Sequence, residues 1–347
     1  MTTSGVRQER AGRTTIRDIA RLSGVSIATV SRVINGRPDV ATRTRDEVMR
    51  VMRAHDFVTN SSARALSVGR TGLIGFTIPL IGESYFADIL SGATEALYEQ
   101  GQRVVLCPTH HEHDREVTLL ERLMNGTTDG AIVLVPEESS EELRTLQAHG
   151  YPFVVADPRQ PLDEGIPAVS ATHAAGARAA TEHLLALGHR RIGLITGTPG
   201  WTATEERLAG YGTALAAAGL PRAADLVVEG HFTTESGYAA ALGLLDLAVP
   251  PTAIFACNDN MAVGAMRAVL ERGLRVPDDI SIIGFDDTEL ARNVFPRLTT
   301  VRQPLAELGR TVVSLLNRLI EGQRTEALRI ELATRLVVRE STSVAPA

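Results

Sequence analysis

The sequence predicts an α/β protein in which a small helical module precedes a larger body built on parallel sheets. A pattern of two short helices occupies Thr15–Gly36, and alternating strand and helix patterns begin at Thr71 and begin again near Arg191. Strand–helix–strand repetition implies parallel strands joined by right-handed crossovers. Two similar halves in one chain indicate two lobes with a cleft between them.

The N-terminal module has the local signals of two helices joined by a tight turn. Thr15 can cap the first helix, and Asp18 follows three residues later, as a capping box requires. Gly24 breaks the helical period and can adopt the left-handed conformation of a sharp turn. Ser26 can then cap a second helix. Together these signals favour a helix-turn-helix over an ordinary two-helix corner.

The second helix has the character of a recognition helix. Ile27, Ala28, Thr29 and Arg32 lie on its outer face if its apolar positions turn inward. Recognition helices offer such side chains to base edges in the major groove, and an arginine can bind guanine through two hydrogen bonds. A third helix, expected from Thr42 to about Ala54, would complete a three-helix domain.

The net charge is divided unevenly between the module and the body. Residues 1–70 contain 13 arginines and 6 acidic residues, a net of +7, although the whole chain carries −6. A basic module on an acidic body is typical of a DNA-binding domain joined to a part with a separate function.

The composition argues against a membrane or secreted protein. No apolar stretch is long enough to span a bilayer, and the first 14 residues form a polar arm without the apolar core of a signal peptide. Cys107 and Cys257 each lie in or beside an apolar run, so we expect buried free thiols in a reducing cytoplasm.

The segment IRDIARLSGVSIATVSRVING resembles the signature of the LacI/GalR family of bacterial transcription regulators, and the similarity continues to about Glu340. The resemblance implies a disordered arm (1–14), a helix-turn-helix domain (15–58), a hinge helix (59–70), an effector-binding and dimerisation domain (71–340) and a tail (341–347). It implies DNA contacts by Thr15, Ser26, Ile27, Ala28, Thr29, Arg32, Asn35, Ala63 and Leu66.

Residues 60–69 allow two interpretations. Their small and polar side chains are typical of a linker. The family resemblance instead implies a hinge helix that enters the minor groove, where Leu66 would wedge between base steps and kink the duplex.

The resemblance also implies a two-lobed periplasmic-binding-protein-like fold for the body. Lobe 1 would comprise about 71–170 and 302–325, and lobe 2 about 171–300 and 326–340. From the sequence we expect strands at 72–78, 103–108, 130–136, 152–156, 191–196, 226–229, 252–256, 281–285 and 328–338. Helices are expected at 86–100, 115–124, 141–149, 205–218, 236–245, 261–272 and 305–320.

Polar residues follow several of the expected strands. Asp157, Asn258 and Asp286 each stand at or next to a strand's carboxyl end, where open α/β sheets bind ligands. Carboxylates accept hydrogen bonds from neighbouring hydroxyls, so this set suits a polyhydroxylated ligand. The alternative for any one of them is that it caps the following helix.

Other residues supply the remaining chemistry of a sugar site. Arg207 can donate hydrogen bonds, and aromatic side chains can pack on the C–H face of a sugar ring. By the family resemblance, the effector contacts are Tyr85, Phe86, Asp157, Trp201, Arg207, Phe232, Asn258 and Asp286.

No catalytic or cofactor-binding motif was found, and we expect neither an enzyme nor a cofactor. The cluster His110–His113 is interpreted as a solvated loop rather than a metal site. The chain lacks the C-terminal leucine heptads of tetrameric relatives, which favours a homodimer on a pseudopalindromic operator.

The sequence therefore predicts a cytoplasmic, nucleoid-associated repressor that a neutral sugar releases from DNA. The alternatives are a regulator that responds to a purine or phosphosugar co-repressor, and a sugar-binding receptor.

Overall fold

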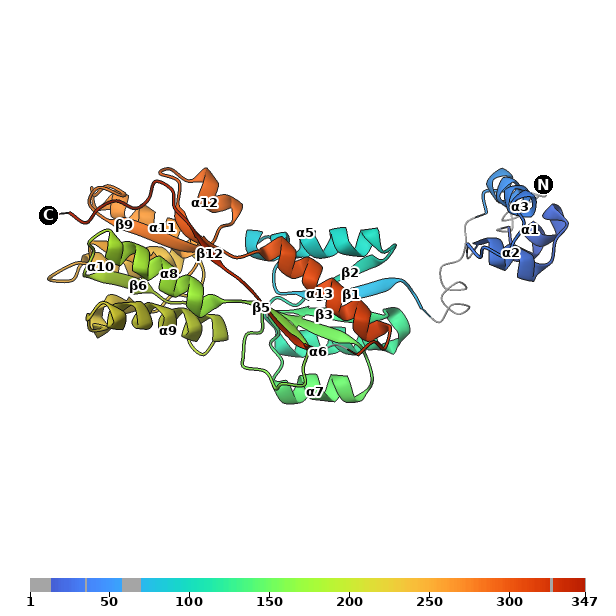
Figure 1. The fold of residues 1–347 in the computed structure, drawn as a ribbon, viewed down its shortest axis with the longest axis horizontal. Helices are drawn as coiled ribbons and strands as arrows, with labels where there is room; N and C mark the ends of the chain where they lie inside the picture. The colour runs from blue at the N-terminus through green and yellow to red at the C-terminus, as the bar shows by residue number, and fades with distance from the viewer. Residues whose placement is uncertain (1–13, 35, 58–69, 325–326, 347) are drawn as a thin grey trace, which may run out of the picture. The chain divides into compact units, whose positions relative to one another are not determined.

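A computed structural model describes residues 14–34, 36–57, 70–324 and 327–346. The chain forms two compact units, Met1–Thr71 and Gly72–Ala347 (Figure 1). The predictions for Asn35, for Ala63 and Leu66 of the hinge segment, and for the arm before residue 14 lie outside the described residues.

The first unit contains the three predicted helices. They are α1 (Ile16–Ser23), α2 (Ile27–Ile34) and α3 (Thr42–Ala54). Their inward faces meet in a small core, which is centred on the fully buried side chains of Ile19, Val30 and Val48.

The predicted local signals of this unit are confirmed. Thr15 and Asp18 form a reciprocal capping box at the start of α1. Gly24 ends that helix in the left-handed region, with φ of 66°. The Ser26 hydroxyl accepts a hydrogen bond from the Thr29 backbone N–H at 3.1 Å and so caps α2.

The second unit contains two six-stranded sheets, each the centre of one lobe. The sheet of lobe 1 has the order β11-β5-β4-β3-β1-β2, and that of lobe 2 has the order β12-β10-β9-β8-β6-β7. All pairings are parallel except β10 with β12. The strands of lobe 1 are β1 (Leu73–Ile78), β2 (Arg103–Pro108), β3 (Gly130–Leu134), β4 (Phe153–Ala156), β5 (Ala168–Ala171) and β11 (Arg329–Leu332). Those of lobe 2 are β6 (Ile192–Ile195), β7 (Val227–Val228), β8 (Ala253–Ala256), β9 (Ser281–Asp286), β10 (Thr299–Arg302) and β12 (Arg335–Val337).

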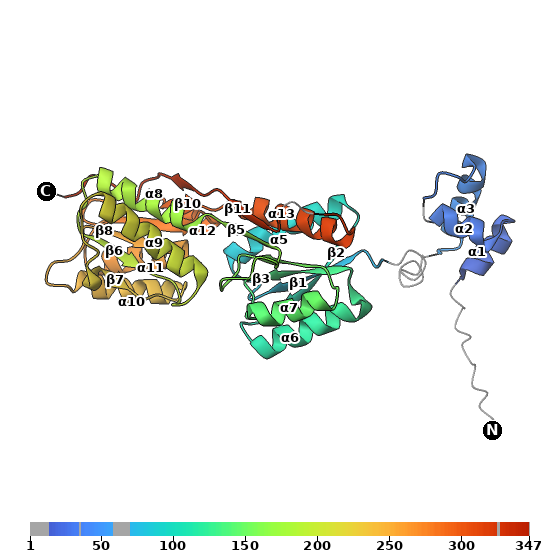
Figure 2. The ribbon, with the colours of Figure 1, turned by 60° about the horizontal axis from the view of Figure 1, so that its bottom comes forward.

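Helices cover both faces of each sheet, as a parallel sheet with two apolar faces requires (Figure 2). In lobe 1 they are α5 (Ser84–Glu99), α6 (His113–Arg122), α7 (Ser140–Ala148), α13 (Leu305–Ile320) and the short π-helix η1 (Leu123–Thr127). In lobe 2 they are α8 (His173–Ala186), α9 (Thr202–Ala217), α10 (Thr234–Leu245), α11 (Asp259–Glu271), α12 (Glu289–Asn293) and the 3-10 turn η2 (Ala224–Leu226). Across the described part of the chain, none of the helices has the length and apolar character needed to cross a bilayer.

The chain crosses between the two lobes three times. The crossovers run from β5 to α8, from β10 to α13 and from β11 to β12. The prediction of one strand over 328–338 in lobe 2 was wrong, because β11 pairs with β5 in lobe 1 and only β12 pairs in lobe 2. Between them, the Thr334 N–H and hydroxyl bind Thr172 of the first crossover, so the chain leaves one sheet before it joins the other.

The C-terminal segment 341–345, which we expected to be a tail, is packed against lobe 2. Ser341 is fully buried. Its carbonyl accepts from the Ile282 N–H at 2.8 Å, and its hydroxyl donates to the Ile282 carbonyl at 2.6 Å. Ala345 N–H donates to the carbonyl of Leu187 at 2.9 Å.

Lobe 1 also buries two acidic side chains. Glu116 accepts hydrogen bonds from the Thr77 hydroxyl at 3.1 Å and from the Glu137 N–H at 2.9 Å. Glu138 is 2% exposed, and its two carboxylate oxygens have no hydrogen-bond partner among the described residues. Burial, followed by repulsion from Glu116, raises the pKa of Glu138 to about 9.

This burial predicts a stability that falls as the pH rises. A carboxyl whose folded pKa lies above its unfolded value holds its proton more tightly in the folded state, so folding stability is lost between about pH 4.5 and pH 9. Glu138→Gln should stabilise the protein by about 1–3 kcal/mol near pH 8 and flatten this slope, as measured by thermal unfolding. The exposed Glu141→Gln on α7 serves as the control. Parallel pH profiles for wild type and Glu138→Gln would contradict the assignment.

Candidate functional site

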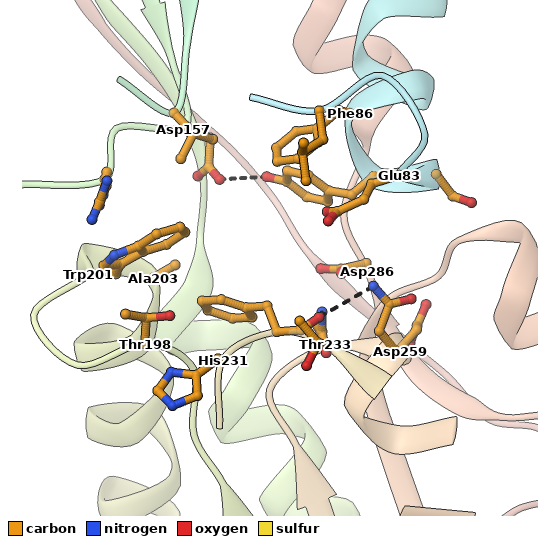
Figure 3. Close-up of a pocket in the computed structure, with 18 of the residues that line it drawn as sticks. Glu83, Phe86, Asp157, Thr198, Trp201, Ala203, His231, Thr233, Asp259 and Asp286 are labelled. Carbon is orange, nitrogen blue, oxygen red and sulfur yellow. Dashed lines mark hydrogen bonds between the residues drawn. The ribbon is translucent and has the colours of Figure 1, made fainter. Parts of the chain in front are cut away.

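A cavity of about 410 Å³ lies between the lobes and is lined by residues from both (Figure 3). Its walls come from segments at or after the carboxyl ends of the strands and from the first turns of α5, α9 and α11. The cavity brings together all of the expected effector-binding residues, namely Tyr85, Phe86, Asp157, Trp201, Arg207, Phe232, Asn258 and Asp286.

Aromatic side chains form two opposed parts of the wall. Trp201 and Phe232 of lobe 2 pack with ring centroids 5.4 Å apart and planes inclined by 36°. Tyr85 and Phe86 of lobe 1 make an edge-to-face pair, also at 5.4 Å. The indole Nε1 of Trp201 is buried without a hydrogen-bond partner in the described structure. It is therefore a donor that a bound ligand can satisfy.

Asp157 is one of the carboxylates that lobe 1 contributes. Its Oδ2 accepts from the Tyr85 hydroxyl at 2.5 Å, and its Oδ1 lies 3.1 Å from Nε2 of His173. Burial favours the protonated acid, but His173, the Tyr85 hydroxyl and the charge of Arg207 together outweigh burial and lower the pKa of Asp157. Asp157 is therefore a charged acceptor.

Asp286 is the corresponding carboxylate of lobe 2. Its Oδ1 accepts from the Gln303 side-chain amide at 2.7 Å and lies 3.9 Å from the Arg207 guanidinium. Burial raises the pKa of Asp286 well above its usual value, and Arg207 and Gln303 offset only part of this. Asp286 has φ of 121°, and such backbone strain in a non-glycine residue concentrates at functional sites.

Arg207 connects these groups from α9. It is 3% exposed and donates to the Cys257 carbonyl and to Nδ1 of His173, the latter at 3.2 Å. Its guanidinium lies 4.0 Å from the ring centroid of Phe285. The arginine is thus fixed by stacking and hydrogen bonds before any ligand arrives.

The helix-capping alternative applies to Asn258 and not to the two carboxylates. Asn258 accepts from the Met261 N–H at 2.9 Å and caps α11, while its amide donates to the Phe232 carbonyl at 2.8 Å. The carboxylates of Asp157 and Asp286 instead accept from side chains.

Sequence reasoning missed several residues of this cavity. Arg159 packs over Trp201, with its guanidinium carbon 4.6 Å from the ring centroid, and pairs with Glu137. His111 lines the cavity, and its Nδ1 lies 3.3 Å from Glu137, while all four residues of His110–His113 are exposed, as expected of a solvated segment. Among the residues that the structure describes, no three or more histidine, cysteine or acidic side chains form a metal-binding group.

The outer face of α2 carries the expected DNA-contacting side chains. Ser26, Ile27, Ala28 and Arg32 are exposed, and Thr29 is half-buried. The Arg32 side chain is 60% exposed, and its Nε lies 3.8 Å from Asp39. A long ion pair in water contributes little, so Arg32 can move to another partner. Thr15 is exposed and engaged in the capping box.

Comparison with known proteins identifies the family. Residues 15–60 match the family described as bacterial regulatory proteins, lacI family, and residues 181–342 match the periplasmic binding protein-like domain. The chain is 37% identical over 343 residues to the HTH-type transcriptional regulator CelR of Thermobifida fusca, which covers 96% of this chain and 99% of the relative.

Two solved structures extend this similarity. A Lac repressor dimer bound to operator and the anti-inducer ONPF has a TM-score of 0.85 at 30% identity and covers 96% of this chain and 100% of that chain. A complex of the transcriptional regulator CelR with cellobiose has a TM-score of 0.72 at 36% identity and covers 95% and 100%. The chain belongs to the LacI family of bacterial transcriptional regulators, and it is a DNA-binding regulator rather than an enzyme.

Proposed function

We propose that the chain is a transcriptional repressor whose operator binding is relieved when a neutral sugar occupies the cavity between the lobes. The observation that carries the proposal is the pair of carboxylates, Asp157 from lobe 1 and Asp286 from lobe 2, beside aromatic walls in one cavity. A ligand whose hydroxyl groups donate hydrogen bonds to both carboxylates stabilises one relative position of the lobes over others.

The charges of the cavity support a neutral ligand over a phosphorylated one. Arg207 is already bound to Cys257 and His173, and Arg159 is paired with Glu137. The lining also includes Glu83 and Asp259, so acidic groups outnumber arginines. A phosphate placed among buried carboxylates would be repelled. A similar protein, CelR, has been solved in complex with cellobiose, which is a neutral sugar, and this also supports a neutral ligand.

The DNA contacts of the first unit are part of the same proposal. The exposed face of α2 with Arg32 reads one half-site, and the hinge residues Ala63 and Leu66 contact the minor groove. The two-fold operator follows if two copies bind together. A regulator of chromosomal genes acts in the cytoplasm at the nucleoid, and that location is likewise proposed.

Arg32 should contribute to the specificity of operator binding. Arg32→Ala should weaken binding to the intergenic DNA upstream of its own gene by about 1–3 kcal/mol and relax the preference at one base pair per half-site. Gel shifts with substituted half-sites measure both effects. Arg50→Ala is the matched control, because Arg50 is an equally charged residue on α3 that pairs with Glu47. Uniform weakening on every sequence would show that Arg32 contacts only phosphate.

The effector can be identified by thermal shift with cellobiose, ribose, phosphosugars and purines, followed by gel shifts with each ligand that stabilises the protein. We expect a neutral sugar to stabilise the protein and release the operator. Reversing a DNA-bound population requires about 5 kcal/mol of differential binding. Asp286→Ala should abolish the shift and leave operator binding intact, whereas the exposed Asp246→Ala should change neither. Stabilisation by a purine or phosphosugar alone, or tighter operator binding with sugar, would overturn the proposal.

An apolar groove on lobe 2 supports the homodimer. The apolar part of its lining is Val263, Met266 and Leu270 of α11 with Val294 and Phe295, and the ion pair of Arg267 and Glu271 completes the lining. Phe295 is 90% exposed and Leu270 is 56% exposed in the single chain. Exposed apolar side chains that gather in one groove mark an interaction site. We assign this groove to a second copy of the chain, and the Lac repressor dimer among the similar structures supports that choice.

The groove gives a direct test of assembly. Phe295→Ser with Leu270→Ser should produce a monomer in light scattering at micromolar concentration and weaken operator binding, because burial of both side chains stabilises the dimer. Val249→Ser removes an apolar side chain that is 60% exposed outside the groove, and this control should remain dimeric. A dimer or tetramer mass for the double variant would rule out this interface.

A further inference from the structure

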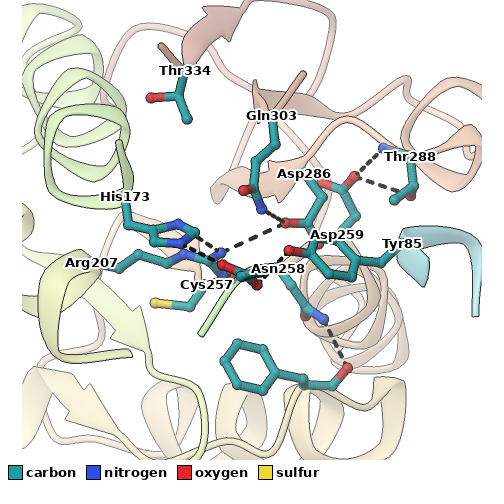
Figure 4. A network of polar contacts seen from close by, with 12 residues as sticks. Tyr85, His173, Arg207, Cys257, Asn258, Asp259, Asp286, Thr288, Gln303 and Thr334 are labelled. Carbon is teal, nitrogen blue, oxygen red and sulfur yellow. Dashed lines mark hydrogen bonds and ion pairs between the residues drawn. The ribbon is translucent and has the colours of Figure 1, made fainter. Parts of the chain in front are cut away.

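Each of the three crossovers between the lobes carries a polar side chain. His173 follows β5 on the first crossover, Gln303 follows β10 on the second, and Thr334 follows β11 on the third. Figure 4 shows that His173 and Gln303 point toward the polar network of the cavity. The backbone at these positions must change for the lobes to move relative to each other.

His173 joins a group of lobe 1 to a group of lobe 2. Its Nε2 lies 3.1 Å from Asp157, its Nδ1 lies 3.2 Å from Arg207, and the residue is 2% exposed. An arginine can only donate, so Nδ1 of His173 is the acceptor and Nε2 carries the proton that binds the carboxylate. The contacts therefore fix both the tautomer and the orientation of the ring.

Gln303 makes the equivalent contact with the other carboxylate. Its amide donates to Asp286 Oδ1 at 2.7 Å, and the residue is 3% exposed. The other end of the amide, Oε1, has no partner among the described residues. The hydrogen bond from the Gln303 amide nitrogen to Asp286 therefore sets the orientation of this side chain.

We propose that His173 and Gln303 are positioning residues that couple the ligand-binding carboxylates to the crossovers between the two lobes. Asp157 and Asp286, one from each lobe, are each held by a donor on a different crossover. A sugar hydroxyl bound to Asp157 or Asp286 therefore meets a carboxylate that His173 or Gln303 already holds in position. Movement of the crossovers in turn displaces the donors and changes the site.

This inference rests on the proposed function for its ligand, but its first measurement needs no ligand. Trp201 is the only tryptophan of the chain, and although it belongs to lobe 2 it packs against the core of lobe 1. Acrylamide quenching of its fluorescence reports the closure of the cavity. His173→Leu should increase quenching in the free dimer, because the hydrogen-bonded tie between Asp157 and Arg207 is lost.

The second measurement is the affinity of the full-length protein for cellobiose by calorimetry. His173→Leu and Gln303→Leu should each weaken binding by about 10- to 100-fold, which is the range for hydrogen bonds to charged groups. His173→Gln retains an amide donor that can reach Asp157 and should recover part of both losses. Thr334→Val on the third crossover contacts neither carboxylate, and it should leave the quenching and the affinity unchanged.

The results separate the inference from the function beneath it. If wild type does not bind cellobiose or any other neutral sugar, the proposed function fails, and the quenching series alone decides the inference. Quenching at the wild-type level in His173→Leu overturns the coupling. So does equal loss in His173→Gln and His173→Leu, because side-chain shape rather than the hydrogen bond would then matter. Thermal unfolding of each variant verifies that it is folded.

Discussion

The central constraint of this molecule is the burial of two carboxylates at the ends of two separate sheets. Removing a carboxylate from water costs several kcal/mol unless donors replace the lost solvent. Asp157 has such donors in Tyr85 and His173, and its pKa is lowered. Asp286 has fewer, and its pKa is raised. The two lobes thus present a buried carboxylate with two side-chain donors and one with a single donor to the same cavity. A hydrogen bond from a ligand contributes most at the carboxylate that has fewer donors from the protein.

The sequence contained most of what was needed to place these acceptors. Strands β4 and β9 are short apolar runs with an aspartate directly after the run or at its end, and parallel sheets align such ends at one edge. The helix-turn-helix was equally accessible, because its capping and turn residues act locally. Both kinds of prediction depend on neighbours in the chain, and neither required knowledge of the tertiary structure.

Helix α8 and strand β5 were not predicted, because their sequences show little difference between buried and exposed positions. Helix α8 is rich in alanine, so its buried and exposed faces differ little, and β5 has only four residues. His173 lies at their junction, where only the tertiary fold brings it to Asp157. The error at 328–338 has the same origin. The apolar alternation continues through both β11 and β12, and the change of sheet at Thr334 depends on a contact with Thr172, which is distant in sequence.

The packed C-terminal segment has a consequence for the architecture of lobe 2. Ser341 and Ser343 bind Ile282 and Ser281 at the amino end of β9, while the cavity lies beyond the carboxyl end of that strand. The C-terminal segment therefore covers the amino end of β9, and the cavity lies beyond the carboxyl end of the same strand. Removing the C-terminal segment would leave the backbone N–H and carbonyl of Ile282 without their Ser341 partners. A fusion partner or affinity tag should therefore be attached after residue 345. A fusion that replaces residues 341–345 would destabilise lobe 2 at a place far from the binding site.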